Sequence, residues 1–341
     1  TLSLFENQYP VQPMGVSYNS YLILDEKIAV MDSVDARAAD EWLAKLAHEL
    51  NGRSPDYLVI SHMEPDHSGS ILRLAEKYQE MKLVGNTKTF TMLRQFFGAK
   101  APTDDRLLEV GEGETLPLGA HTLHFMLAPM VHWPEVMVAY EETEKLLFSA
   151  DAFGRFGSLG RTANAPWAPQ ARRYYYNIVG KYGAQVQALL KKASALEIKT
   201  VCPLHGPVLT GEALGEALRL YDLWSRWQSE SPDDILLAHA SIHGNTARAA
   251  ELFKQKLEAK GARVTLCDLT TTEVSYAVAN AFYCGKLVLA CSTYDGGLFP
   301  PMEEFLSHLQ AKGFRSRTVG LMENGSWAPA AARLMRAKLE E

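Results

Sequence analysis

The chain has 341 residues, which is enough for two domains that each bury their own core. Hydrophobic residues make up 47% and charged residues 22%, an ordinary composition for a soluble globular protein. The net charge is −6, there is no long basic run, and no apolar stretch approaches the roughly 18 residues of a membrane span, so the sequence argues against nucleic acid and a membrane as partners.

The first part of the chain alternates between strands and helices and then becomes mainly β. The expected elements are strands at 20–24, 28–31, 57–60 and 82–84 and helices at 36–50, 68–77 and 89–97. Strands follow one another from 107 to 149, and a long helix at 171–196, a strand at 200–202 and a helix at 212–227 complete this part. This order favours two sheets between layers of helices over a barrel.

A dense group of possible metal ligands follows the strand at 57–60. His62, Glu64, Asp66 and His67 lie within six residues, directly after a buried strand that can aim them at one point. Mixed nitrogen and oxygen donors suit iron, manganese or zinc, and do not suit a thiolate zinc site or an all-oxygen calcium site. One segment of this kind supplies at most half of the ligands of a two-metal site.

Three further candidates occupy equivalent places in the same part of the chain. His132, Asp151 and His205 each lie just past the C-terminal end of an apolar strand. Because such strand ends can converge on one edge of a sandwich, we expect these three residues to complete the ligand set. Histidines away from these places are expected to be structural or exposed, and these are His48, His121, His124, His239 and His308.

A short polar segment with a proline, residues 229–233, is expected to link the first part to a second domain. Beyond it, the expected elements alternate strictly: strands at 235–240, 263–267, 286–291 and 318–321, and helices at 245–259, 274–281, 302–311 and the C-terminus. This pattern predicts a doubly wound α/β domain. Polar loops with glycine follow three of its strands, at the edge where open α/β sheets bind ligands.

The first of these loops suits a phosphate group. It opens a helix with Ser241, Asn245 and Thr246, whose hydroxyl, amide and backbone N–H groups favour an anion at the helix N-terminus.

The ligand pattern of the first part resembles the metallo-β-lactamase-like domain of the flavodiiron proteins, also called A-type flavoproteins. The shared sequence motifs are Tyr18-Asn19-Ser20-Tyr21-Leu22, His62-x-Glu64-x-Asp66-His67-Ser68-Gly69-Ser70, Pro129-Met130-x-His132-Trp133-Pro134 and Asp151-Ala152-Phe153-Gly154, together with His205. Hydrolytic members of the superfamily typically carry histidine where this chain has Glu64. The added anionic oxygen favours iron over redox-inert zinc.

The resemblance implies a residue-by-residue assignment of two iron ions. His62, Glu64 and His132 hold one iron in the family, Asp66, His67 and His205 hold the other, and Asp151 bridges both. This leaves positions open for a diatomic substrate.

The second part resembles a flavodoxin, which implies bound FMN. The expected FMN contacts are Ser241, Ile242, His243, Asn245, Thr246, Ser292, Thr293, Tyr294, Asp295, Gly296, Asn324, Gly325, Ser326 and Trp327. Tyr294 and Trp327 are candidates to lie beside the isoalloxazine ring, with ordinary packing at the sheet edge as the alternative. His243 departs from the aromatic residue that the family usually has there.

The resemblance implies an αββα metallo-β-lactamase-like sandwich in residues 1–230 and a flavodoxin-like doubly wound parallel sheet in residues 234–341. Both ends of the sequence are short against the family. No strand is expected before the Leu4-Phe5-Glu6 motif, and no fifth strand is expected after the fourth βα unit. Since a missing fifth strand would leave a sheet edge open, we expect the sequence to be trimmed, at its C-terminal end in particular.

The function implied is that of a flavodiiron oxidoreductase, which reduces dioxygen to water or nitric oxide to nitrous oxide with electrons from FMN. The external electron donor is expected to be rubredoxin, a flavin reductase or a reduced cofactor. Two alternatives stay open: a zinc or iron hydrolase that uses a metal-bound hydroxide, and an FMN electron carrier or redox sensor. Glu64 and the seven-ligand set argue against the hydrolase.

The expected assembly is a homodimer or a dimer of dimers. Subunits of the family pair head to tail, so that the flavin of one lies beside the di-iron site of the other, and Trp133 is a candidate to line that pocket. The four cysteines form no Cys-x-x-Cys pair, and reduced thiols in the cytoplasm are the simplest account.

Overall fold

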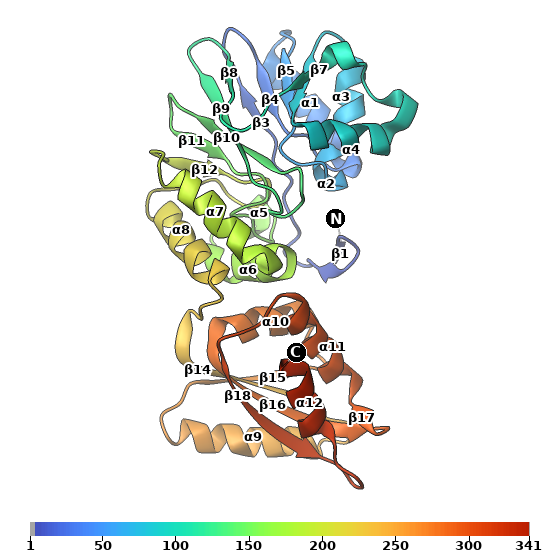
Figure 1. Cartoon of the computed structure of the whole chain (residues 1–341), viewed down its shortest axis with the longest axis vertical. Helices are drawn as coiled ribbons and strands as arrows, with labels where there is room; N and C mark the ends of the chain where they lie inside the picture. The colour runs from blue at the N-terminus through green and yellow to red at the C-terminus, as the bar shows by residue number, and fades with distance from the viewer. Residues whose placement is uncertain (1–3, 341) are drawn as a thin grey trace. The chain divides into compact units, whose positions relative to one another are not determined.

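The computed structural model describes residues 4–340 (Figure 1). The chain divides into two compact units. The first unit contains Val11–Ala171 and Ala184–Arg219, and the second contains Glu6–Pro10, Arg172–Gly183 and the chain from Leu220 onward. The outer ends of the two expected domains, Thr1 and Glu341, lie outside the described residues.

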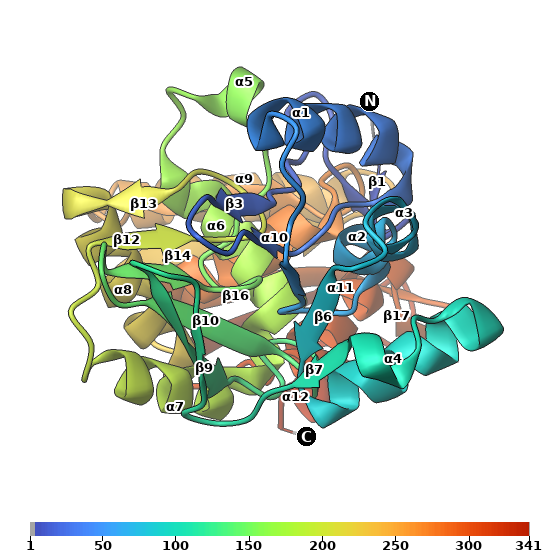
Figure 2. The ribbon, with the colours of Figure 1, turned by 90° about the horizontal axis from the view of Figure 1, so that it is seen from above.

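The first unit contains two sheets. The five-stranded sheet has the order β3 (Tyr21–Ile23), β4 (Ala29–Met31), β5 (Tyr57–Val59), β6 (Lys82–Gly85) and β7 (Leu107–Glu109). The six-stranded sheet has the order β13 (Leu209–Thr210), β12 (Thr200–Cys202), β11 (Leu146–Phe148), β10 (Met137–Glu141), β9 (Thr122–Leu127) and β8 (Thr115–Pro117). In the view from above, β9 and β10 run side by side as an antiparallel pair (Figure 2).

The alternation of side chains along β4 explains how the layers form. Ala29 and Met31 point into a core shared by both sheets, where they meet Phe125 and Phe148. Val30 points the other way, into a second core under the helices. The helices that supply this core are α1 (Ala39–Leu50), α3 (Ile71–Lys77) and α4 (Thr87–Phe97).

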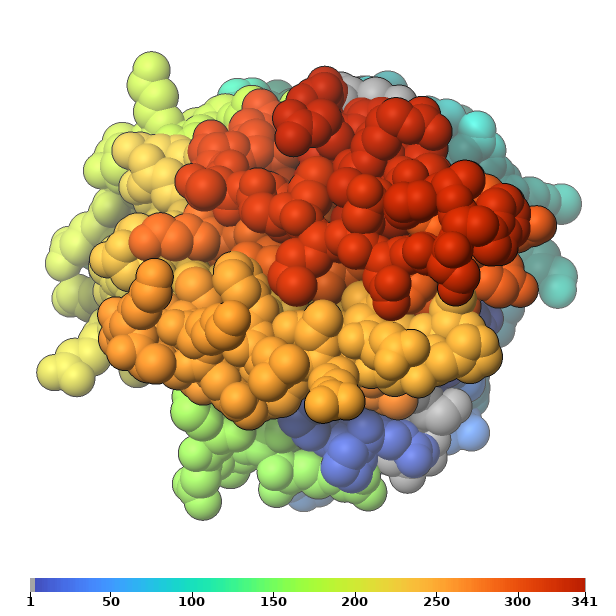
Figure 3. Space-filling model, turned by 90° about the horizontal axis from the view of Figure 1, so that it is seen from below, coloured from blue at the N-terminus to red at the C-terminus, as the bar shows by residue number. Residues whose placement is uncertain are grey.

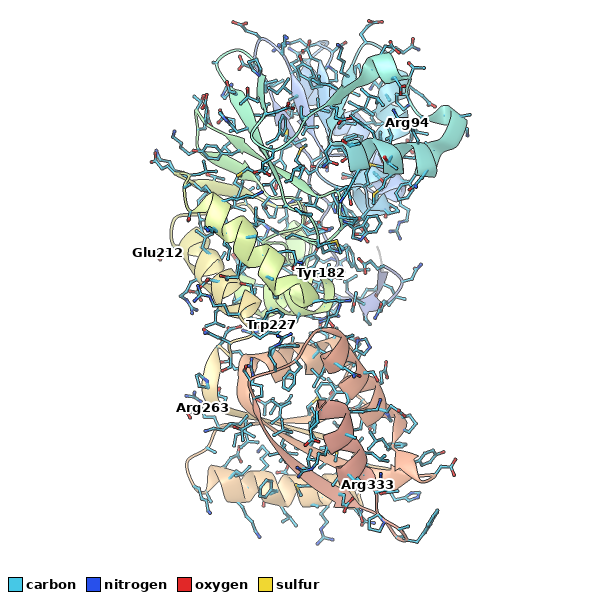
Figure 4. The ribbon with its side chains drawn as sticks, viewed as in Figure 1. Arg94, Tyr182, Glu212, Trp227, Arg263 and Arg333 are labelled. Carbon is cyan, nitrogen blue, oxygen red and sulfur yellow. The ribbon has the colours of Figure 1, made fainter. Side chains whose placement is uncertain are left out.

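On the other side of the sandwich, α7 (Gly183–Ala193) lies beside the six-stranded sheet (Figure 1). Its Lys192 donates from Nζ to the Leu127 carbonyl of β9 at 2.8 Å. The expected αββα sandwich is confirmed. At the surface, Arg94 of α4, labelled in Figure 4, donates to Asp104 at 2.6 Å.

The long helix expected at 171–196 is interrupted. The structure has α6 (Trp167–Tyr174), a π-helical turn (Tyr175–Val179), a 3-10 turn (Gly180–Tyr182) and then α7. All five residues of the π-helical turn are buried, so this segment has no solvent face and cannot continue an amphipathic helix. The segment belongs to the second unit, where Tyr176 stacks on Phe282 with ring centroids 3.9 Å apart.

The second unit contains a parallel sheet in the order β15 (Val264–Asp268), β14 (Ser231–Ala240), β16 (Cys284–Tyr294) and β18 (Thr318–Asn324), with the short β17 (Gly297–Leu298) antiparallel to the end of β16. Helix α9 (Asn245–Glu258) covers one face, and α10 (Val274–Tyr283), α11 (Pro300–Ala311) and α12 (Ala331–Glu340) cover the other (Figure 1). The expected doubly wound, flavodoxin-like sheet is confirmed.

The expected linker at 229–233 is partly a strand, because β14 already begins at Ser231. The pairing of β14 with β16 shifts register between Ser231 and Ile235, around Pro232. Proline lacks a backbone N–H group, so it is tolerated at such an irregularity.

The remaining elements are the 15-residue helix α8 and several short ones. They are β1 (Leu4–Phe5), β2 (Tyr9–Pro10), α2 (Pro65–Ser68), α5 (Leu159–Thr162), α8 (Gly211–Ser225) and the 3-10 turns Ala36–Ala38, Gly98–Lys100 and Asp104–Arg106. In residues 4–340, no helix combines the length and the apolar character needed to cross a membrane.

Candidate metal centre and loop cluster

The seven expected ligands come together at one end of the first unit in two adjoining groups. One group is His62, Glu64, His132 and Asp151, and the other is Asp66, His67 and His205. Within each group the potential ligand atoms all lie within 4.8 Å of one another. Four loops supply them, after β5, β9, β11 and β12, so the strand ends do converge on one edge.

Asp151 lies between the two groups and faces both. Its Oδ2 is 3.3 Å from His62 Nε2 and 3.1 Å from His132 Nε2. Its Oδ1 is 3.2 Å from His67 Nε2 and 3.5 Å from His205 Nε2. One carboxylate therefore presents a separate oxygen to each group.

Each group also has a carboxylate of its own. Glu64 Oε2 lies 3.2 Å from His62 Nε2 and 3.1 Å from His132 Nε2. Asp66 Oδ2 lies 3.3 Å from the Nε2 atoms of both His67 and His205. The two groups thus match in composition, with two imidazoles, one carboxylate and one oxygen of Asp151 each.

The burial of these atoms indicates that they are built for cations. Asp151 and His67 are 1% exposed, and His62 and His205 are fully buried. Within residues 4–340, both carboxylate oxygens of Asp66 and of Asp151, together with His132 Nε2, lack a hydrogen-bond partner. Buried polar atoms of this kind are costly unless something satisfies them, and a metal pair would do so. The nitrogen and oxygen donors fit iron.

The electrostatics point the same way. Burial by itself would lower the pKa of His132, but the facing Asp151 and Glu64 carboxylates outweigh it and raise the pKa to about 9. Burial would raise the pKa of Asp151, but His67 and His62 outweigh it and hold the pKa well below the usual range. Since metal ligands must be deprotonated at the coordinating atom, metal binding at this site is expected to release protons.

Two buried carboxylates behind His62 escaped the sequence reasoning. Glu135 Oε1 lies 2.8 Å from His62 Nδ1, and Asp32 Oδ1 accepts the backbone N–H of Ser61 at 2.7 Å. Asp32 directly follows β4, the same strand-end position that identified the ligands, so that rule could have found it. Glu135 follows the expected ligand His132 by three residues, and only the folded loop brings it back to His62.

The motif from Tyr18 to Leu22, with the preceding Ser17, has a structural role beside His205. The side chain of Asn19 donates from Nδ2 to the carbonyls of Pro203 at 2.8 Å and Gly206 at 2.7 Å. The Ser17 carbonyl lies 2.8 Å from His205 Nδ1. This segment clamps the loop that carries His205 and fixes the direction of its ring.

The three glycine-containing loops of the second unit also converge. A cavity of about 90 Å³ is lined by ten of the expected FMN contacts, namely Ser241, Ile242, His243, Asn245, Thr246, Ser292, Thr293, Asn324, Gly325 and Ser326. Thr246 Oγ1 and Ser292 Oγ are hydrogen-bonded at 2.8 Å, and Asn324 Nδ2 donates to Thr246 Oγ1 at 3.3 Å. Figure 3 shows the orange α9 segment beside the red C-terminal segment on this unit.

This edge suits a flat ligand that carries a phosphate. Helix α9 begins after Gly244 without a side-chain cap, so its first N–H groups can bind an anion. Tyr294 is 48% exposed and Trp327 is 72% exposed, outside the lining of the small cavity. An exposed indole of this kind can stack on an aromatic ring of a ligand.

Comparison with known proteins gives consistent matches over both units. Residues 16–206 match the family model described as ODP family beta lactamase. The rubredoxin-oxygen oxidoreductase of Megalodesulfovibrio gigas is 26% identical, with 96% of this chain and 82% of that protein aligned. The anaerobic nitric oxide reductase flavorubredoxin of Vibrio vulnificus is 27% identical over 96% of this chain and 67% of that protein.

A solved structure agrees with these matches. The crystal structure of the flavodiiron protein from Giardia intestinalis aligns with a TM-score of 0.92 at 26% identity and covers 100% of this chain and 83% of that one.

Proposed function

The chain belongs to the ODP family of beta-lactamase-like proteins and to its flavodiiron members, and from this premise we propose that it reduces dioxygen to water, nitric oxide to nitrous oxide, or both. The observation that carries the proposal is the position of Asp151, which presents one oxygen to each of two matched ligand groups at 3.1 to 3.5 Å. Two metals held side by side could act together on one small substrate.

His62, Glu64 and His132 are proposed to hold one iron, Asp66, His67 and His205 the other, and Asp151 both. When bound, the iron pair supplies the electrons and the positive charge for reduction of the diatomic substrate. The protein's own contribution is to hold the ligands and to limit water. The rings of Phe5 and Tyr18 pack edge-on against His205, at centroid distances of 5.3 and 5.6 Å, and Trp133 packs on His62 at 5.2 Å.

The second unit is proposed to hold FMN at its loop cluster. The phosphate would lie at the start of α9 with Ser241, Asn245 and Thr246, and the ring would lie near Tyr294 and Trp327. When bound there, FMN would supply one-electron chemistry. Its electrons would come from an external donor such as rubredoxin, a flavin reductase or a reduced cofactor, and the name of the Megalodesulfovibrio relative supports a donor of the rubredoxin kind.

The protein is further proposed to work in the cytoplasm as a homodimer or a dimer of dimers. The four cysteines are free and buried, which suits a reducing compartment. An isologous pairing would allow the flavin edge of one subunit to meet the metal edge of its partner.

Metal and flavin analysis of the purified protein tests the proposal. Protein produced without oxygen in iron-supplemented medium should contain close to two irons and one FMN per chain. With electrons supplied continuously by a flavin reductase and its reduced cofactor, it should consume dioxygen or nitric oxide over several turnovers. Zinc with negligible iron would favour the hydrolase alternative instead, and bound FMN and iron without turnover would favour an electron carrier.

A further inference from the structure

We propose that Glu135 is a positioning residue that makes the two iron positions unequal, so that the iron held with His62 remains ferric when the other has been reduced. This inference rests on the proposed function, because it requires iron in both ligand groups.

Glu135 is fixed so that one of its oxygens faces the His62 ring. Oε1 accepts the backbone N–H of Met63 at 2.9 Å and lies 2.8 Å from His62 Nδ1. The residue is 1% exposed. A carboxylate oxygen that already accepts one N–H also accepts the second, so Nδ1 donates its proton to Glu135. His62 Nε2, which faces Glu64 and Asp151, is then left with its lone pair for a metal.

Neighbouring contacts hold this arrangement in place. Asn86 donates from Nδ2 to the Glu135 carbonyl at 2.6 Å, and its Oδ1 caps the start of α4. The backbone N–H of Met137 donates to the Ser61 carbonyl at 3.1 Å, which ties the Glu135 loop to the His62 loop. The carboxylate is therefore part of the scaffold and does not have to be recruited when metal binds.

The histidines of the second ligand group have different surroundings at Nδ1. His205 Nδ1 faces the Ser17 carbonyl, which is neutral, at 2.8 Å. His67 Nδ1 is buried and has no hydrogen-bond partner among the described residues. The two groups match in their direct ligands but differ in what contacts Nδ1 of their histidines, since Glu135 contacts His62 directly. The Asp32 carboxylate acts on both His62 and His67 and does not distinguish the groups.

This difference has a predictable direction. A carboxylate that accepts the Nδ1 proton makes the imidazole a stronger donor, and it adds a negative charge that the buried surroundings screen weakly. Both effects stabilise the ferric state more than the ferrous state at the His62 position. Of the two electrons that reduce a diferric pair, the first should go to the Asp66, His67 and His205 position, and the second to the position supported by Glu135.

Replacement of Glu135 by glutamine isolates the charge. Glu135→Gln keeps the size of the side chain and an acceptor oxygen for His62 Nδ1. The holoprotein would be titrated with dithionite and mediators, and the half-reduced iron pair would be followed by electron paramagnetic resonance. The potential of the second reduction should rise by at least about 59 mV, a tenfold change for one electron, and the potential of the first should change less. The signal of the half-reduced pair should therefore reach a lower maximum.

Two further variants make the test decisive. Glu141→Gln is the matched control, because Glu141 is also a buried glutamate whose carboxylate accepts backbone N–H groups, and it lies at the opposite end of β10 from the Glu135 loop. It should leave both reductions unchanged. Glu135→Asp keeps the charge, and its second reduction potential should lie between those of wild type and Glu135→Gln. It replaces Glu135→Gln in the titration if the glutamine variant loses iron.

If a variant that retains two irons shifts both reduction potentials equally, or shifts neither, the role of Glu135 is overturned and the proposed function stands. Wild-type protein without iron would overturn both.

Discussion

Asp151 is the side chain on which both ligand groups depend, because each of its oxygens faces a different pair of histidines. Asp151→Ala should therefore remove most of both irons, whereas Glu64→Ala removes a ligand from one group and should retain close to one iron. Elemental analysis of the two variants, together with circular dichroism to confirm folding, checks this. An Asp151→Ala protein with both irons and full turnover would show that the carboxylate is no bridge.

A second residue pair makes stability depend on pH, away from the metal centre. His121 Nδ1 lies 2.7 Å from Asp25 Oδ2, and this hydrogen bond raises the pKa of His121. A group whose pKa is higher in the folded than in the unfolded state stabilises the fold by its full amount at pH values below the unfolded pKa, which is about 6.5 for histidine. This stabilisation is lost as the pH rises through the folded pKa.

His121→Gln should therefore lower the free energy of unfolding more at pH 6 than at pH 9. Urea titrations at both pH values measure the difference, and His48→Gln, which removes an exposed imidazole, is the control. An equal cost at the two pH values would mean that the proton on His121 contributes nothing to stability.

At the scale of elements, the start of α9 is predicted to bind the FMN phosphate. Ser241→Ala combined with Thr246→Ala removes two hydroxyl groups there. Since a hydrogen bond to a charged group contributes about 1.5–3 kcal/mol, the double variant should weaken FMN binding at least tenfold. Fluorescence titration of the flavin-free protein measures this.

Iron content should not change in the double variant, because the expected iron ligands and FMN contacts belong to different units. Ser307→Ala, on the exposed side of α11, is the matched control. Parallel loss of both cofactors would indicate general unfolding rather than a lost phosphate contact.

The strand ends explain how much of the site was predictable. His62, His132, Asp151 and His205 were identified because each follows an apolar strand, and strands of two packed sheets end at a common edge. Glu135 was not identified, because its role depends on a loop that returns to His62, and no spacing in the sequence records that return.

The fold was predicted to a similar depth. For most strands and helices, the spacing of hydrophobic residues in the sequence predicted the element that the structure has. The interruption at Tyr175–Val179 was missed because a segment buried on all sides and a helix with one buried face look alike when many residues are aromatic. The two-residue strands β13 and β17 are too short to show any period.

At the scale of the whole molecule, the proposed dimer predicts complementation between inactive variants. One variant lacks iron (His62→Ala with His132→Ala) and the other lacks FMN (Ser241→Ala with Thr246→Ala). After subunit exchange, roughly a quarter of the wild-type turnover should return, because about half of the dimers are mixed and each mixed dimer has one intact flavin facing one intact iron pair. Oxygen consumption measures the recovery. If exchange is demonstrated and no turnover returns, electrons pass within one chain.

The assignment of Arg172–Gly183 to the second unit bears on any attempt to excise that unit as a portable flavin module. A gene fragment that starts at residue 234 would omit Tyr176, which stacks on Phe282, and Arg173, whose Nε donates to Ser275 Oγ at 2.7 Å. The excised fragment would then expose an aromatic surface and aggregate. A usable module would need Glu6–Pro10 and Arg172–Gly183 grafted ahead of a fragment that starts at Leu220, so the natural gene cannot be cut once to separate its two cofactors.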